Sequence, residues 1–341
     1  MTSTVESSRS GDRRAARAHR SHRAAVTPYL FIGPLVLVFA VFYLWPAIAT
    51  IASSFFRWGI LNPWQTQSPA DWQFVGISNY GDTLASGDFW NATLNSAIWL
   101  VVFPVLVLAS SLPLAILIWS TPRGASFFRS VFIVPMTISL AAAGVIWTFI
   151  YNPDPNKGLL NAALHLFGLD NASFTLGPLE IHAGHWLSNP GVLHLGFADI
   201  RLVNLFIIIP AVWAFAGFGV ITFSAGLTSV PDELLDAARV DGAGRIQLIR
   251  HVVMPSLRPS VIVVTVISVI FALRTFDIVF VTTGGGPAQD SEVLAMLLWN
   301  QVFQFLNSPQ GGLSAAIAVL MSVFMIVIAM PYLRATLKGN K

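Results

Sequence analysis

The chain has 341 residues, of which 55% are hydrophobic and only 10% are charged, and its formal net charge is +3. With a mean hydropathy of +0.69, this composition excludes an ordinary soluble protein and is typical of a membrane protein. The absence of cysteine excludes disulfides, thiolate metal sites and a cysteine nucleophile.

Residues 1–26 predict a disordered basic tail, because their arginines lie among Ser, Ala, Gly and His without apolar periodicity. The segment has no aromatic residue and an apolar run follows at once, so we expect no nucleic-acid partner. We expect the charge to hold the tail in the cytoplasm, near anionic membrane lipid. The arginines are Arg9, Arg13, Arg14, Arg17, Arg20 and Arg23.

The first apolar run covers Tyr29 to Phe56 and predicts a first transmembrane helix over residues 27–57. Ala47-Ile48-Ala49 resembles a signal-peptidase site, but the run is too long for the apolar region of a typical signal peptide. Pro34 and Pro46 are tolerable in a membrane helix whose freed carbonyl groups find other partners.

Further apolar runs give about six transmembrane helices in all, in a polytopic, all-α membrane protein. We expect a core of about five of these helices over residues 90–336. The later spans are predicted at residues 92–119, 127–151, 202–228, 259–283 and 313–333.

The distribution of Lys and Arg predicts that both termini are cytoplasmic, in a multi-pass protein of the cell membrane. With this orientation, nearly all of the 19 basic residues lie in cytoplasmic segments, including the loop 229–259. The exceptions are Arg57, Lys157, Arg201 and Arg274.

The expected outer segments, residues 57–90 and 152–200, are rich in Trp, Pro and Asn and mildly acidic. They have room for short interfacial helices such as Leu159–Phe167. His182, His185 and His194 suggest a metal site, but their spacing is a weak signal and we expect no bound metal.

The polar loop 229–259 predicts two short helices. Ser229 and Asp232 have the spacing of a capping box for a first helix that ends near Asp241, and Gly242 is suited to a left-handed C-cap. A second helix is expected to begin near Gly244 and to stop before Pro255. Periodicity alone leaves two interpretations open: an ordinary helical hairpin, or a helix that docks in a groove of another protein.

A longer spacing favours docking. Asp236-Ala237-Ala238, three residues, Gly242, nine residues and then Val252-x-Met254-Pro255 resembles the E-A-A signature of ATP-binding-cassette (ABC) importer permeases. Asp replaces the usual Glu, and Val and Met replace Ile and Leu. Between about Tyr29 and Arg334, other segments look like the sugar-permease branch of the maltose and glycerol-3-phosphate type: Phe74–Tyr80, Arg123–Pro135, Asn152–Leu164, Arg239–Ala243 and Phe276–Pro287.

The resemblance implies a type I ABC importer permease fold. It also implies that a second permease subunit, usually a different chain, completes the pathway, that two cytoplasmic ATPases bind the loop, and that an external protein delivers the solute. The residues that the resemblance places in the coupling loop are Glu233, Asp236, Ala237, Ala238, Gly242 and Pro255.

The lysines exclude ATP binding by a P-loop in this chain. A P-loop needs Gly-Lys followed by Ser or Thr, and Lys157, Lys338 and Lys341 follow Asn, Leu and Asn. The energy for transport must then come from a partner or an ion gradient. The resemblance implies that this chain is not an enzyme and binds no cofactor, with ATP and Mg at the partner ATPase.

The solute pathway is less clear from the sequence. Arg274 and Asp277 lie three residues apart in the fifth predicted span, where ionisable residues suggest function. Arg274 should lie about 24 Å along this helix from Arg258, toward the outer boundary. A structural pair that anchors the following Gly-rich turn and a sugar contact both remain open. Further candidates, whose amides and flat rings suit sugars, are Asn95, Trp147, Trp213, Asn300 and Gln301.

Three functions compete. The favoured one is an ABC permease for a mono- or oligosaccharide, with glycerol phosphate or a polyol as alternative solutes. An ion-coupled secondary transporter would need an ion site near the midplane and usually a repeat, and neither is evident. A membrane-embedded enzyme would need clustered His or carboxylates at one depth.

Overall fold

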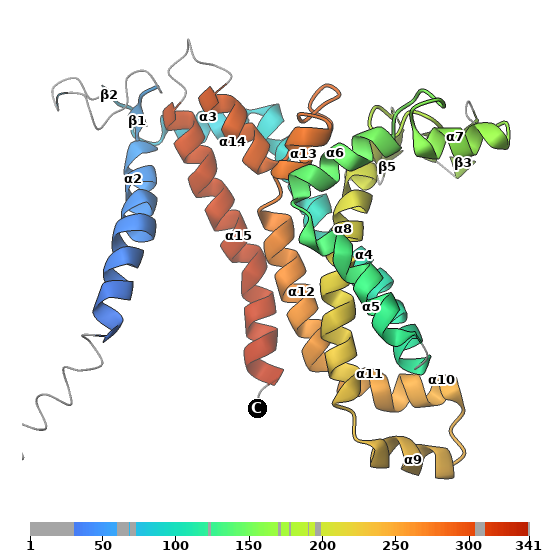
Figure 1. Ribbon diagram of the computed structural model, residues 1–341. Helices are drawn as coiled ribbons and strands as arrows, with labels where there is room; N and C mark the ends of the chain where they lie inside the picture. The colour runs from blue at the N-terminus through green and yellow to red at the C-terminus, as the bar shows by residue number, and fades with distance from the viewer. Residues whose placement is uncertain are drawn as a thin grey trace, which may run out of the picture.

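The computed structural model describes residues 31–59, 68, 73–121, 124–169, 172–176, 179–189, 191–194, 199–303 and 311–339. The predicted tail, residues 1–26, lies outside this part of the chain. Most described residues are helical, and the long helices run between two ends of the molecule (Figure 1). We call these the α9 end, which carries α9 (Asp232–Val240), and the α7 end, which carries α7 (Leu159–Leu166).

Within the described residues, three continuous helices are long and apolar enough to cross a membrane. They are Phe31–Ser53, which contains the π-helical turn η1 (Ala40–Leu44) and α2 (Trp45–Ser53), and then α4 (Gly87–Ser120) and α8 (Leu202–Thr228). Counting each of two bent helix pairs as one span raises the number to five. The last predicted span falls within α15 (Gly311–Gly339).

The span predicted at residues 127–151 is a sharply bent pair of helices. α5 (Ala125–Ile133) and the 3-10 helix η3 (Val134–Thr137) are followed by α6 (Leu140–Ile150) after a bend of 101°. Pro135 lies in the 3-10 turn and has no N–H to donate. Ser139 then starts a new helix, because its Oγ accepts a hydrogen bond from the Ala142 N–H at 3.2 Å.

The expected helix over residues 259–283 is also interrupted. α12 (Arg258–Leu273) ends at Arg274, and α13 (Asp277–Thr282) begins after Phe276, which has a non-helical φ of −143°. Asp277 lies in the first turn of α13, where a negative charge is favourable. A connection then leads to α14 (Leu294–Phe303).

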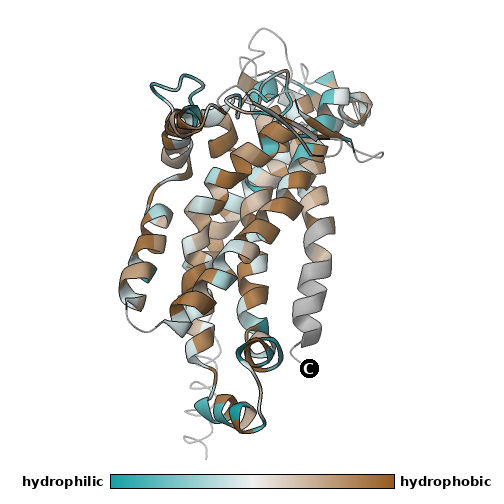
Figure 2. Ribbon diagram, turned by 90° about the vertical axis from the view of Figure 1, so that its right-hand side faces the viewer, coloured by the Kyte–Doolittle hydropathy of each residue, from teal (hydrophilic) through white to brown (hydrophobic). Residues whose placement is uncertain are grey.

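The core lies where α4, α8 and α12 pack together. Its centre is aromatic: the ring of Phe103 stacks on Phe271 at 5.4 Å, and Phe215 lies 4.8 Å from Phe271. Small residues allow close approach elsewhere, since a Cβ at Gly217 of α8 would collide with the carbonyl oxygen of Phe132 in α5. Hydrophobic residues predominate along the spans, and hydrophilic ones gather toward the ends (Figure 2).

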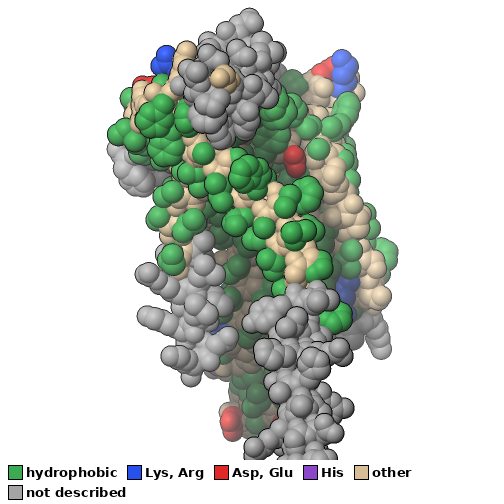
Figure 3. Space-filling view, turned by 90° about the vertical axis from the view of Figure 1, so that its left-hand side faces the viewer, with side chains coloured by type: hydrophobic (Ala, Val, Ile, Leu, Met, Phe, Trp, Pro, Cys, Tyr) green, Lys and Arg blue, Asp and Glu red, His purple; other side chains and the backbone are tan. Residues whose placement is uncertain are grey.

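The outer surface is apolar over much of the bundle. The side chains of Phe31–Ser53 are largely exposed, although α2 packs against α15. The described side chains on this side of the molecule are mostly hydrophobic (Figure 3). Such a surface suits contact with lipid or with another membrane protein.

The α7 end is covered by short elements. α3 (Ser78–Ala85) precedes α4, and three antiparallel strand pairs lie in the loops. The pairs are β1 (Phe56–Arg57) with β2 (Gln73–Phe74), β3 (Ser173–Leu176) with β4 (Leu179–His182), and β5 (Val192–His194) with β6 (Asp199–Arg201).

The packing of α8 predicts that Gly217→Ala destabilises the protein by about 1–3 kcal/mol, because the added methyl group forces α5 and α8 apart. Gly33→Ala is the matched control, since a Cβ at that helical position meets nothing within 4 Å. Thermal unfolding in detergent, followed by size-exclusion chromatography, measures both. Equal apparent Tm values for the two variants would contradict this packing.

Candidate functional site

The loop between α8 and α12 forms a helical hairpin that projects from the α9 end (Figure 1). α9 buries Leu235, whereas Glu233, Asp236 and Ala237 are exposed and Ala238 is half-buried. An ion pair joins Asp236 Oδ1 to Arg239 at 2.8 Å, but both groups are exposed and the pair adds little stability. The exposed face of α9 is therefore available to another protein.

The start of α9 differs from the prediction. Ser229 does not cap this helix; its Oγ donates to the Gly226 carbonyl oxygen at 2.7 Å and closes the end of α8. The N-cap position is Pro231, without a side-chain cap, because the chain turns between the two helices. The end of α9 is as predicted: Gly242 has a φ of +81°, and the Ala243 N–H returns to the Ala238 carbonyl at 2.9 Å.

The second helix of the hairpin continues where the sequence predicted a stop. α10 (Arg245–Leu248) leads through a π-helical turn, η4 (Ile249–Val253), into α11 (Met254–Ser256), so the helix passes through Pro255. A π turn shifts the hydrogen-bond partners by one residue and so accommodates the missing N–H of proline. A 65° bend then joins this helix to α12.

A cavity of about 520 Å³ lies at the two helix breaks. Arg274 and Asp277 line it, together with the rings of Phe215, Phe271 and Phe276. Both charged side chains are exposed, and the structure records no ion pair between them. The predicted structural pair is therefore not formed, because the helix break at residues 274–276 separates the two residues.

The other pathway candidates lie outside this cavity. Trp147 of α6 and Trp213 of α8 pack edge to face at 6.0 Å. Asn300 and Gln301 belong to α14, and each has a buried carbonyl oxygen without a hydrogen-bond partner within the described structure. The structure does not bring these side chains together with Arg274.

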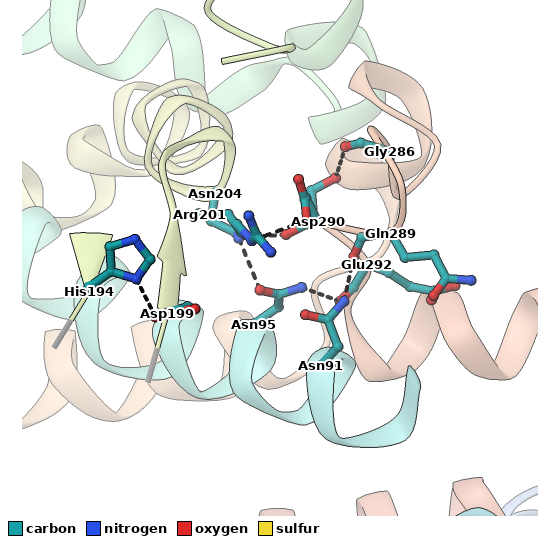
Figure 4. Close-up of polar contacts among 11 residues, drawn as sticks. Asn91, Asn95, His194, Asp199, Arg201, Asn204, Gly286, Gln289, Asp290 and Glu292 are labelled. Carbon is teal, nitrogen blue, oxygen red and sulfur yellow. Dashed lines mark hydrogen bonds and ion pairs between the residues drawn. The ribbon is translucent and has the colours of Figure 1, made fainter. Parts of the chain in front are cut away.

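Asn95 is part of a buried polar network that holds the connection between α13 and α14 (Figure 4). Its Nδ2 donates to the Glu292 carbonyl at 2.9 Å, and its Oδ1 accepts from Asn204 Nδ2 at 3.0 Å. Asn204 also donates to the Asp290 carbonyl at 3.0 Å. Asn95 therefore has a structural role, linking α4 and α8 to this connection.

Two outer contacts complete the network. Arg201 Nε lies 3.2 Å from Asp290 Oδ1, and Asn91 Nδ2 donates to the Gln289 carbonyl at 2.7 Å (Figure 4). They hold a turn in which Ala288 and Gln289 have left-handed φ values of 46° and 66°. Sequence patterns missed these partners. The signal that could have found them is that Asn91 and Arg201 lie near the first residues of two long apolar helices, α4 and α8.

Glu292, in the connection outside the spanning helices, is almost fully buried. Burial raises the pKa of its carboxyl group, and nearby Asp88 adds to the rise. The hydrogen bond from Asn300 Nδ2 to Glu292 Oε1 acts in the opposite direction.

The histidines form no metal site in the described residues, since no three His, Cys, Asp or Glu side chains gather there. His194 instead contacts Asp199, with 2.7 Å between Nδ1 and Oδ1 (Figure 4).

We expect Asn95→Leu to leave the Glu292 carbonyl and one of the two N–H groups of the Asn204 amide unpaired, at a cost of about 1–3 kcal/mol. Hydrogen–deuterium exchange of residues 283–293 should then increase. Asn91→Leu removes an exposed bond and should change this exchange less. A larger effect from Asn91→Leu would show that the buried network does not fix the connection.

Comparison with known proteins agrees with this architecture. The chain is 29% identical over 321 residues to a probable ABC transporter permease protein of Pyrococcus horikoshii, covering 94% of this chain and 99% of that protein. It is 28% identical to a trehalose/maltose transport system permease protein of Thermococcus litoralis, covering 92% and 94%. A bacterial ABC transporter involved in alginate import has the same fold, with a TM-score of 0.72 at 19% identity, covering 95% and 100%.

A family model covers most of the chain. Residues 94–334 match the model described as the inner membrane component of binding-protein-dependent transport systems. The match includes the core helices, the hairpin and both helix breaks. The chain therefore belongs to this family of membrane transport components.

Proposed function

We propose that this chain is the permease subunit of an ATP-driven importer for a sugar, and that the α9 hairpin couples it to a separate ATPase. The exposed hairpin and its rigid attachment to the spans are the observation that carries this proposal. The chain forms part of the solute pathway and does not hydrolyse ATP, and ATP with Mg binds to the partner.

The attachment of the hairpin supports a mechanical role. One stem is α8, and the other passes from α11 into α12 at Leu257, which is fully buried. A Cβ at Gly226 would collide with Leu257 and Ser260, so the two stems pack in close contact. A push on α9 therefore moves both helices together.

A movement of the two stem helices would also change the cavity, because both helices form part of its wall. α8 supplies Phe215 and α12 supplies Phe271 to the cavity wall, so a rotation of the two stems changes its shape. We propose that the ATPases draw the hairpins of two permease subunits together and switch the pathway between inward-open and outward-open states.

The orientation follows from the basic residues. Arg239, Arg245, Arg250 and Arg258 lie at the α9 end, which we place in the cytoplasm with both termini. The α7 end then faces outward, where a solute-binding protein delivers its cargo.

The cavity suits a carbohydrate. Arg274 and Asp277 can hydrogen-bond sugar hydroxyls, and the Phe rings offer flat apolar faces. Helix breaks of this kind form solute sites in other transporters. The relative named for trehalose/maltose transport supports the same class. A glycerol phosphate ester is the second candidate, because the charge of Arg274 suits an anion.

The proposal predicts that the tagged chain co-purifies with an ABC ATPase and a second permease. Vesicles containing this assembly and its binding protein should take up a labelled sugar in the presence of ATP, and vanadate should stop the uptake. A sugar and glycerol phosphate panel identifies the solute. Uptake that depends on a proton gradient and resists vanadate would overturn the proposal.

Gly242 offers a sharper test of coupling. Gly242→Ala places a side chain at a φ of +81°, where it costs about 1–2 kcal/mol, and should distort the end of α9. We expect slower sugar uptake with a normal amount of transporter in the membrane. Gly244→Ala is the matched control, because its φ is −69° and the new Cβ makes only ordinary contacts. Equal uptake by both variants would contradict coupling through this turn.

A further inference from the structure

α7 is amphipathic in the opposite sense to a helix of a soluble protein. Its polar face points inward: Asn161 is fully buried, donates to the Asn152 and Gly184 carbonyls at 2.7 and 3.2 Å, and accepts from Trp186 Nε1 at 2.9 Å. These bonds fix the rotation of the helix about its axis.

The opposite face of α7 is apolar and exposed. Leu159 is 70% exposed, Leu166 83% and Phe167, which ends the helix, 78%. With Ala163, also exposed, these residues are spaced at i, i+4, i+7 and i+8 and form one stripe. We call this set the α7 stripe.

The position of α7 indicates what covers this stripe. Trp186, to which Asn161 is bonded, lies 6.1 Å from the ring of Tyr151, and Tyr151 lies 5.1 Å from Trp147. Tyr151 closes the end of α6, against which α7 packs. Aromatic clusters at the ends of spanning helices mark the membrane–water interface. α7 also lies across the direction of the spans, beside the end of the bundle (Figure 1).

Charge favours lipid over a protein partner. Residues 158–169 contain no Asp, Glu, Lys or Arg, so the helix itself carries no charged side chain of these types that could select a protein. Before the helix begins, Lys157 and Asp154 are paired at 3.3 Å, and Asp170 is the next charged residue after it in the sequence. Phe149 of α6, the helix against which α7 packs, is also apolar and 65% exposed.

We propose that α7 is a lipid anchor, with its stripe inserted among the acyl chains and headgroups of the outer leaflet. The anchor holds the outer end of α6, which lines the solute cavity through Leu140 at its other end. It thereby fixes one wall of the pathway relative to the bilayer. This proposal does not depend on the ATPase.

The absence of cysteine allows a direct test. Leu166→Cys and Phe167→Cys are each spin-labelled in the full transporter, reconstituted in phosphatidylethanolamine and phosphatidylglycerol vesicles without binding protein. Ser188→Cys is the control, because Ser188 is exposed and lies in the loops of the α7 end. Collision rates with oxygen, which concentrates in lipid, and with a water-soluble nickel chelate are compared by electron paramagnetic resonance.

We expect the oxygen rate to exceed the nickel rate severalfold at positions 166 and 167, and the reverse at position 188. A higher nickel rate at both stripe positions would place the stripe in water and overturn the proposal. Low rates with both reagents would show that a protein covers it, which also overturns the proposal. ATP-driven sugar uptake by the same variants, in vesicles supplied with the binding protein, reports separately on the proposed function.

Discussion

The contact between the end of α8 and the start of α12 is the constraint on which the rest of the molecule depends. A Cβ at position 226 would force the side chains of Leu257 and Ser260 to move, so glycine at this position allows the two helices to pack closely. The π turn before Pro255 keeps the other stem helical up to the same point. Two short helices that bury little surface of their own are thereby held firmly by two long ones.

Different interactions stabilise the two ends of the molecule. At the α9 end, packing of apolar stems supports an exposed polar hairpin. At the α7 end, buried amides hold the connection between α13 and α14, and each carbonyl that they bind would otherwise be unpaired. Between these ends, two helix breaks leave Arg274 and Asp277 facing a cavity. This division suits a protein that receives force at one end and a solute at the other.

Local signals in the sequence predicted part of this structure well. Hydropathy located α8, and Gly242 marked the end of α9, because both depend on residues close in the chain. Hydropathy could not show the breaks at Ser139 and Arg274, since a broken helix is as apolar as a straight one. The structural role of Asn95 could not be predicted from local sequence patterns either, because its partner Glu292 is 197 positions away in the chain. Ser229 satisfied a capping pattern but closes the preceding helix instead.

The central claim is that α9 docks on an ATPase, and a cross-link tests it most directly. Leu234 lies on the exposed face of α9 with 51% of its surface accessible, so a photoreactive residue placed there reaches any docked protein. Irradiation of the intact transporter in its membrane should link this position to an ABC ATPase, with a yield that changes when ATP is added. A transporter that takes up its solute normally but gives no cross-link to any ATP-binding protein would contradict the account.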